Sequence, residues 1–178
     1  VTDEAVKAEF NSYFSSKGKE YYRAIADSSK AVADGDLVYM HYTGVLVSVL
    51  ENAVKAGSIP DTRCTGMTYS EILALSLGFE GGTTDKLTSL EIGSNTYISG
   101  FESGLVGYVP SQAGEENPVR LALSFPQNYS SQELAGQAVI FFCKLVYIGD
   151  KAAGVYTDET ISVGLVNEIM GMSAEKAY

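Results

Sequence analysis

Short apolar runs separated by glycine- and proline-containing turns dominate this chain, and they predict an antiparallel β-sheet with few helices. The predicted strands are 37–43, 87–92, 119–125 and 138–148. Between the second and third strands, residues 98–106 have the spacing of one short helix, set between Gly100 and Gly107. Strands of this kind around a single short helix are typical of an α+β domain.

Helical spacing characterises the first 33 residues instead. Apolar side chains recur at intervals of three and four along its first half, after a capping residue at Thr2 or Asp3. Gly18 divides the stretch into two pieces. The sequence therefore predicts an N-terminal helical segment over 1–33, ended by the turn at 34–36.

The segment 47–78 interrupts the strand pattern. Its spacing predicts one helix over 47–56 and a second over 68–77, which Thr68 caps. We therefore expect a domain over 34–150 that carries 47–78 as a helical insertion. A helical tail or linker over 151–178, with its helix beginning at Thr157, follows.

Composition indicates one folded domain with an acidic surface. Hydrophobic residues make up 46% and charged residues 19% of the 178 residues, which suffices for a buried core. The formal net charge of −10 disfavours nucleic acid as a partner. Two cysteines, Cys64 and Cys143, lie far apart, and a disulfide between them is the less favoured alternative. No apolar run approaches the ~20 residues of a membrane span.

Conventional catalytic groups are scarce. His41 is the only histidine, and a single histidine inside a strand is more often structural than catalytic. His and Cys residues do not cluster, so we expect no metal and no other cofactor. The turn at 81–84 lacks the lysine of a phosphate-binding loop. An enzyme built on this sequence would therefore use neither a general base nor a metal ion.

Several sequence blocks, in one order, are similar to those of FKBP-type peptidyl-prolyl cis–trans isomerases. The blocks are residues 35–44, Phe79-Glu80-Gly81-Gly82, residues 98–107, residues 113–116 with 121–125, Phe125-Pro126-Gln127-Asn128-Tyr129, and Leu134-Ala135-Gly136-Gln137-Ala138. The second and the last two resemble the trigger-factor branch of this family. The resemblance implies a twisted antiparallel sheet wrapped around a short central helix, with a pocket between them.

The resemblance also implies the site residues. Those matching the family's catalytic pocket are Tyr42, Phe79, Glu80, Ile98, Phe101, Tyr129 and Phe141. Tyr97, with Ile98, matches the segment whose N–H groups receive the substrate carbonyl. Thr88 stands where relatives carry a pocket aromatic, and Leu87 or Leu90 partly fills that space. Without the resemblance, these apolar residues would be interpreted as core, and Glu80 as a surface acid.

The implied function is isomerisation of X-Pro bonds in unfolded or partly folded chains, by desolvation and twisting of the amide in an apolar aromatic pocket. The alternative is a non-catalytic or weakly catalytic chaperone or protein-binding module, which Thr88 and the 47–78 insertion favour. We expect the insertion's apolar residues, such as Val49, Val54, Ile72 and Leu75, to pack on the sheet or to contact client chains.

The implied partners are proline-containing unfolded or nascent polypeptides. Ribosome docking is not expected, because the Gly-Phe-Arg-x-Gly-x-x-Pro signature is missing from the sequence. The chain begins at Val1 rather than at methionine, which leaves both a cytoplasmic and an exported or lipoprotein origin open, and we expect the native polypeptide to continue past Tyr178.

Overall fold

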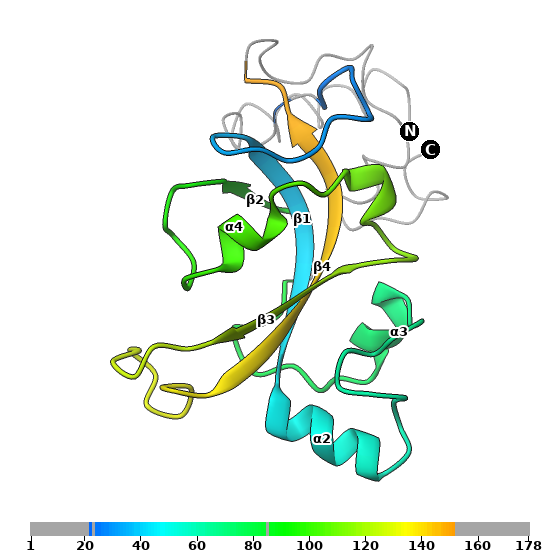
Figure 1. Cartoon of the computed structure of the whole chain (residues 1–178), viewed down its shortest axis with the longest axis vertical. Helices are drawn as coiled ribbons and strands as arrows, with labels where there is room; N and C mark the ends of the chain where they lie inside the picture. Colours follow the sequence, from blue (N-terminus) through cyan, green and yellow to red (C-terminus); the bar gives the residue numbers. More distant parts are fainter. Residues whose placement is uncertain (1–21, 23, 85, 152–178) are drawn as a thin grey trace, which may run out of the picture.

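A four-stranded antiparallel sheet organises the chain, with strand order β2-β1-β4-β3 (Figure 1). The computed structural model describes residues 22, 24–84 and 86–151. The strands are β1 (Leu37–Leu46), β2 (Thr88–Glu91), β3 (Val119–Ser124) and β4 (Ala138–Gly149). All four strands predicted from the sequence are confirmed, and the α+β arrangement fits an FKBP-like fold. The predicted helices before residue 22 and after Thr157 lie outside the described residues.

The two central strands set the geometry of the sheet. β1 and β4 pair antiparallel along their length, with Tyr42 opposite Cys143 and Gly44 opposite Phe141, and their register shifts between Tyr39 and Met40. Both faces of β4 are covered, which explains why its sequence is an almost continuous apolar run rather than an alternating one.

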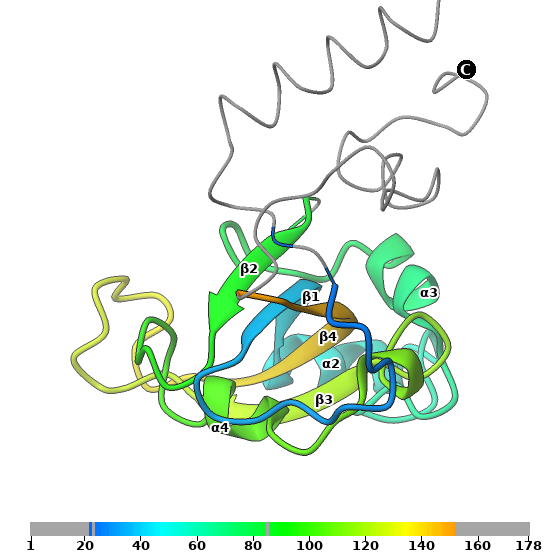
Figure 2. The same ribbon diagram turned by 90° about the horizontal axis from the view of Figure 1, so that it is seen from above.

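Helices cover the sheet on both faces. The short helix α4 (Phe101–Leu105) packs on one face, where its Phe101 and Leu105 join a core with Met40 and Phe141. Helices α2 (Val47–Lys55) and α3 (Tyr69–Ala74) pack on the other face (Figure 2). A 3-10 turn, η1 (Pro110–Gln112), leads into β3. The central helix α4 therefore lies on the face of the sheet opposite to that covered by α2 and α3.

The 47–78 segment has its own small core against the sheet. Leu50 of α2 and Ile72 of α3 are buried with Phe142 of β4, and Val49, Val54 and Leu75 pack around them. Of the two alternatives predicted for these apolar residues, packing on the sheet or contact with client chains, the first is confirmed. Both predicted helices are present, and Thr68 and Glu71 form a capping box at the start of α3. Cys64 and Cys143 are buried free thiols.

Two helix ends differ from prediction because of backbone conformation. α4 begins at Phe101 rather than at residue 98, since Gly100 has a φ of 91°, outside the helical region. α3 ends at Ala74 rather than at Leu77, since Ser76 has a φ of 52°. In the first case a left-handed residue delays the start of a helix, and in the second a left-handed residue follows its early end, although the apolar spacing alone predicts longer helices.

The predicted N-terminal helix is wrong for its last ten residues. Residues 24–33 are bends, turns and extended chain, with Ala24 bridged to Gly149. The Ile25 N–H donates to the Ile148 carbonyl at 2.9 Å, and the Val32 N–H donates to the Tyr108 carbonyl at 2.9 Å. These tertiary bonds replace the helical ones, while Ile25 and Val32 still reach the core. Among the described residues, none of the helices has the length and hydropathy required to cross a membrane.

Candidate functional site

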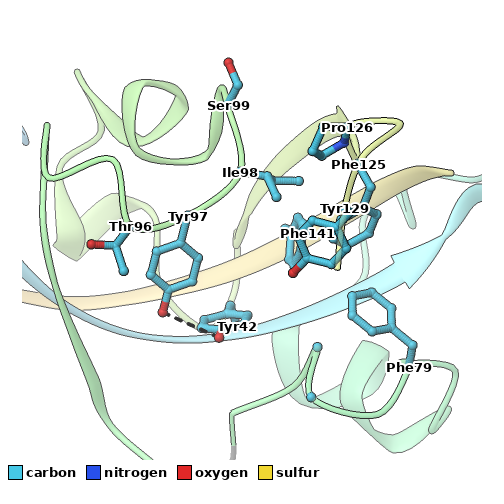
Figure 3. A pocket seen from close by; sticks show the side chains of 12 residues that line it. Tyr42, Phe79, Thr96, Tyr97, Ile98, Ser99, Phe125, Pro126, Tyr129 and Phe141 are labelled. Atoms are coloured by element: carbon cyan, nitrogen blue, oxygen red, sulfur yellow. Dashed lines mark hydrogen bonds between the residues drawn. The ribbon is translucent and has the colours of Figure 1, made fainter. Parts of the chain in front are cut away.

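A cavity of about 540 Å³ opens beside the central helix, between the sheet and three loops. It is lined by Tyr42, Phe79, Gly81, Gly82, Thr96, Tyr97, Ile98, Ser99, Phe125, Pro126, Tyr129 and Phe141 (Figure 3). None of these side chains is charged. The cavity therefore offers an apolar, mostly aromatic environment with a few hydroxyl and backbone groups at its edge.

The floor of the cavity is a set of rings that meet edge to face. Phe101 of α4 is completely buried, and its ring centre lies 5.0 Å from that of Phe141 on β4, at an interplanar angle of 81°. The Tyr42 ring, from β1, lies 5.6 Å from the Phe101 ring at 75°. Edge-to-face contacts of this kind are the favoured geometry of aromatic pairs. Three different elements thus lock one rigid aromatic surface.

Tyr97 forms one wall. Its ring stacks on Phe101 with centres 4.5 Å apart, and its hydroxyl donates to the Tyr42 hydroxyl at a long 3.5 Å (Figure 3). Burial, followed by the contact with Tyr42, raises the pKa of Tyr97 well above its ordinary value. The phenol is therefore neutral across the physiological range and remains a hydrogen-bond donor.

The opposite wall is formed by Phe79, Phe125 and Tyr129. The Phe79 and Phe125 ring centres are 5.7 Å apart, and those of Phe125 and Tyr129 are 4.7 Å apart. The turn that begins at Phe79 is attached to β1, because the Gly44 N–H donates to the Gly82 carbonyl at 2.7 Å. This attachment brings Phe79, the first residue after the 47–78 segment, to the cavity.

Most of the residues predicted for the site gather here. Tyr42, Phe79, Tyr97, Ile98, Tyr129 and Phe141 line the cavity. Phe101 lies directly beneath them. The structure thus brings together seven of the nine predicted residues, from β1, α4, β4 and three loops.

Glu80 and Leu90 lie elsewhere. Glu80 is exposed in the turn after Phe79 and is outside the cavity lining. Leu90 pairs with Val38 across the β2–β1 ladder and is buried in the core, 3% exposed. Thr88, the residue in place of an aromatic, does not reach the cavity either, and its hydroxyl lies 3.0 Å from that of Thr84.

Phe125 is a further site residue that was not predicted from the sequence. It belongs to one of the FKBP-like blocks but ends a predicted strand, where an apolar residue is usually core. The signal was its position directly before Pro126, at the start of the loop that carries Tyr129. Thr96 and Ser99 were also missed, because small polar residues in a turn carry no distinguishing pattern.

The antiparallel sheet, the short helix against one face and the aromatic cavity beside that helix define an FKBP-like domain. No protein-family model matches the chain. Its curated relatives include the trigger factor of Alkaliphilus oremlandii, 39% identical over 114 residues, which are 64% of this chain and 24% of the relative. The trigger factor of Exiguobacterium sp. is 31% identical over 153 residues, or 86% of this chain and 32% of the relative.

A third relative, the trigger factor of Clostridioides difficile, is 38% identical over 114 residues, which are 64% of this chain and 24% of the relative. The chain thus matches about a quarter to a third of the length of these curated relatives. The resemblance to the trigger-factor branch inferred from sequence blocks is confirmed. The chain is a relative of one part of trigger factor, and its own fold is FKBP-like.

Proposed function

We propose that this domain is a peptidyl-prolyl cis–trans isomerase that acts on X-Pro bonds of unfolded or partly folded chains. The observation that carries the proposal is the cavity lined by six aromatic rings and no charged side chain, with Phe101 beneath it. The relatives named trigger factor support the same class of activity.

The chemistry of the reaction fits such a cavity. Rotation about a peptide bond faces a barrier of roughly 18–20 kcal/mol, because resonance holds the amide planar and charge-separated. In the twisted transition state the nitrogen loses conjugation, and the amide becomes less polar. An apolar aromatic cavity therefore favours the twisted form over the planar one, so it lowers the barrier by differential binding without acid–base chemistry.

The edge of the cavity offers an anchor for the substrate backbone. The Tyr97 N–H is occupied by Glu102 at 3.2 Å, whereas the Ile98 N–H makes no hydrogen bond with any described residue. Ile98 lines the cavity and points into it (Figure 3). We assign the Ile98 N–H as the donor to the substrate carbonyl, and Tyr42, Phe79, Tyr129 and Phe141 as the surface that receives the proline ring and its neighbours.

The substrates and domain limits belong to the same proposal. Proline-containing unfolded or nascent polypeptides are the partners that an open apolar cavity suits, since flexible chains expose X-Pro bonds. The unit that binds them spans 34–150, with 47–78 as an insertion that packs on the face of the sheet away from the cavity.

A binding module with little catalysis is the second candidate. The position of Thr88 favours it, because Thr88 contacts Thr84 and contributes no ring to the cavity. The two candidates differ in a measurable way. A binding module retains proline-containing peptides but leaves their rate of isomerisation unchanged.

A protease-coupled assay with an X-Pro tetrapeptide tests the proposal. We expect the wild-type chain to accelerate isomerisation, and Tyr129→Ala to lower kcat/KM about tenfold, the effect of losing about 1.4 kcal/mol of transition-state stabilisation. Tyr108→Ala is the matched control, because Tyr108 is exposed and lies outside the cavity lining. A wild-type rate equal to that of buffer alone rejects the isomerase and leaves the binding module.

A further inference from the structure

A single buried carboxylate holds the loop that forms one wall of the cavity. Glu102 of α4 is only 7% exposed. It accepts hydrogen bonds from the backbone N–H groups of Gly93 at 2.9 Å, Asn95 at 2.9 Å, Thr96 at 2.7 Å and Tyr97 at 3.2 Å. The Ser94 hydroxyl adds a fifth bond at 3.3 Å. Every donor comes from the segment 93–97, and no cation among the described residues pairs with this carboxylate.

The other contacts of this segment are few: the Ser94 N–H donates to the Glu91 carbonyl at 3.2 Å, and the Tyr97 ring stacks on Phe101. A second cavity, of about 440 Å³, lies on its other side and is lined by Asn95, Tyr97, Ser99 and Glu102, among others. The segment 93–97 therefore borders two cavities, and its contact with the core is the stacking of the Tyr97 ring on Phe101. Asn95 has a φ of 55°, a left-handed conformation that Asn tolerates better than most residues, and its N–H points to the Glu102 carboxylate.

We propose that Glu102 is the positioning residue of the site: its carboxylate holds 93–97 in one conformation and thereby places the Tyr97 ring and the Ile98 N–H at the cavity. The inference rests on the proposed isomerase function and adds a residue to it. Glu102 does not line the cavity, so it acts through the loop and not on the substrate.

The role requires a carboxylate and not merely a polar side chain. One oxygen, Oε1, accepts from Ser94, Thr96 and Tyr97, while Oε2 accepts from Gly93 and Asn95. A glutamine of the same size presents an NH₂ group on one side, and in either orientation that group faces two backbone N–H donors from which it cannot accept. In either orientation of the amide, two of the hydrogen bonds that hold the segment 93–97 are therefore lost.

The ionisation of Glu102 agrees with this geometry. Burial raises the pKa of the carboxyl. The hydrogen bonds from the backbone N–H groups of Asn95, Tyr97, Thr96 and Gly93 lower it by a larger amount, so the net pKa lies below the ordinary value. The carboxyl is therefore ionised wherever the enzyme is assayed near neutral pH, and it is able to accept all five bonds.

The test compares Glu102→Gln with Glu116→Gln, an exposed glutamate outside both cavities. We expect Glu102→Gln to fold, to lose hydrogen-exchange protection at the amides of 93–97, and to lower kcat/KM about 10- to 100-fold. The loss should come mainly through KM, because the Ile98 N–H binds the carbonyl in both ground and transition states. Glu116→Gln should behave as wild type.

The outcomes separate this inference from the function on which it rests. An inactive wild type rejects the isomerase, while exchange at 93–97 still reports whether Glu102 holds the loop. An active wild type with unchanged KM and unchanged protection in Glu102→Gln overturns the positioning role. If Glu102→Gln does not fold, Glu102→Asp keeps the charge on a shorter stem that cannot reach all five donors, and a wild-type KM in that variant overturns the inference equally.

Discussion

At the scale of single residues, the cavity depends on the absence of a side chain at Gly44. A Cβ at this position would lie 2.6 Å from Cε1 of Phe141 and 2.9 Å from Cε1 of Phe79. Both contacts are closer than van der Waals packing allows, so any larger residue has to displace rings from the floor or the wall. Glycine here is required by close approach and not by backbone conformation.

Gly44→Ala is therefore expected to reduce both isomerase activity and stability. Displaced rings change the cavity directly, so we expect kcat/KM to fall about tenfold or more, while overpacking costs about 1–3 kcal/mol of unfolding free energy. Gly114→Ala is the matched control, because a Cβ there meets only ordinary contacts at 3.6 and 3.7 Å. Peptide assays together with urea unfolding of both variants measure the two effects. An unchanged kcat/KM in Gly44→Ala contradicts the ring geometry described here.

Site residues could be predicted from the sequence only where the resemblance to the family assigned a role to a position. Phe101 and Tyr97 could be predicted in this way. Glu102 was part of the same block but carried no signal of its role, because its five partners come from a loop whose path depends on the tertiary fold. Leu90 was predicted to replace a missing aromatic residue of the site, but its pairing with Val38 directs its side chain into the core.

At the scale of elements, one arginine ties the 47–78 segment to β3. Arg120 donates from Nε to the Arg63 carbonyl at 2.8 Å, and from Nη2 to the carbonyls of Cys64 at 3.2 Å and Met67 at 3.1 Å. These carbonyls lie in the loop between α2 and α3. The planar guanidinium spans three acceptors that a single ammonium cannot reach together.

Arg120→Lys should destabilise the 47–78 segment and leave the cavity on the other face of the sheet unchanged. We expect a loss of about 2 kcal/mol in unfolding free energy, since charged hydrogen bonds to the loop carbonyls are broken, and faster hydrogen exchange within 58–68. Arg63→Lys is the control, because the exposed Arg63 side chain donates a single bond to the Arg120 carbonyl at 3.3 Å. Equal stability of the two variants would show that Arg120 does not tie the segment to the sheet.

Elements stabilised by local spacing were predicted well, whereas those stabilised by distant contacts were not. The helices α2 and α3 have their own apolar faces, and Thr68 marks the start of α3. Residues 24–33 also place apolar side chains at helix-like intervals, but their backbone bonds go to β4 and to Tyr108. Spacing alone cannot distinguish these two cases.

At the scale of the whole molecule, the ionised carboxylates set the response to acid. Besides Glu102, Glu115 also has a lowered pKa. Burial raises this pKa, but hydrogen bonds from Ser70 and the Lys144 ammonium, 3.3 Å away, lower it by a larger amount. Groups whose pKa is depressed by folding contribute stability above their unfolded pKa, near 4.3. That contribution is lost as the pH falls through the folded pKa.

The free energy of unfolding should therefore be nearly constant near neutral pH and should decline below about pH 4.5. Glu102→Gln lacks one of these carboxylates, so its stability should depend less steeply on pH in the acid range. Urea unfolding of both proteins between neutral and acid pH measures the difference. Parallel curves would mean that the Glu102 carboxylate has the same pKa in the folded and unfolded chains, contrary to its five hydrogen bonds.

Exchange NMR on an X-Pro peptide at equilibrium tests the central claim most directly, because it observes both isomers without a coupling protease. Uncatalysed exchange takes tens to hundreds of seconds, too slow to give cross-peaks. We predict that a catalytic amount of the chain produces cis–trans exchange cross-peaks, that Tyr129→Ala weakens them, and that Tyr108→Ala leaves them intact. Peptide resonances that broaden or shift on binding, with no exchange between the isomers, would contradict the isomerase and identify a binding module.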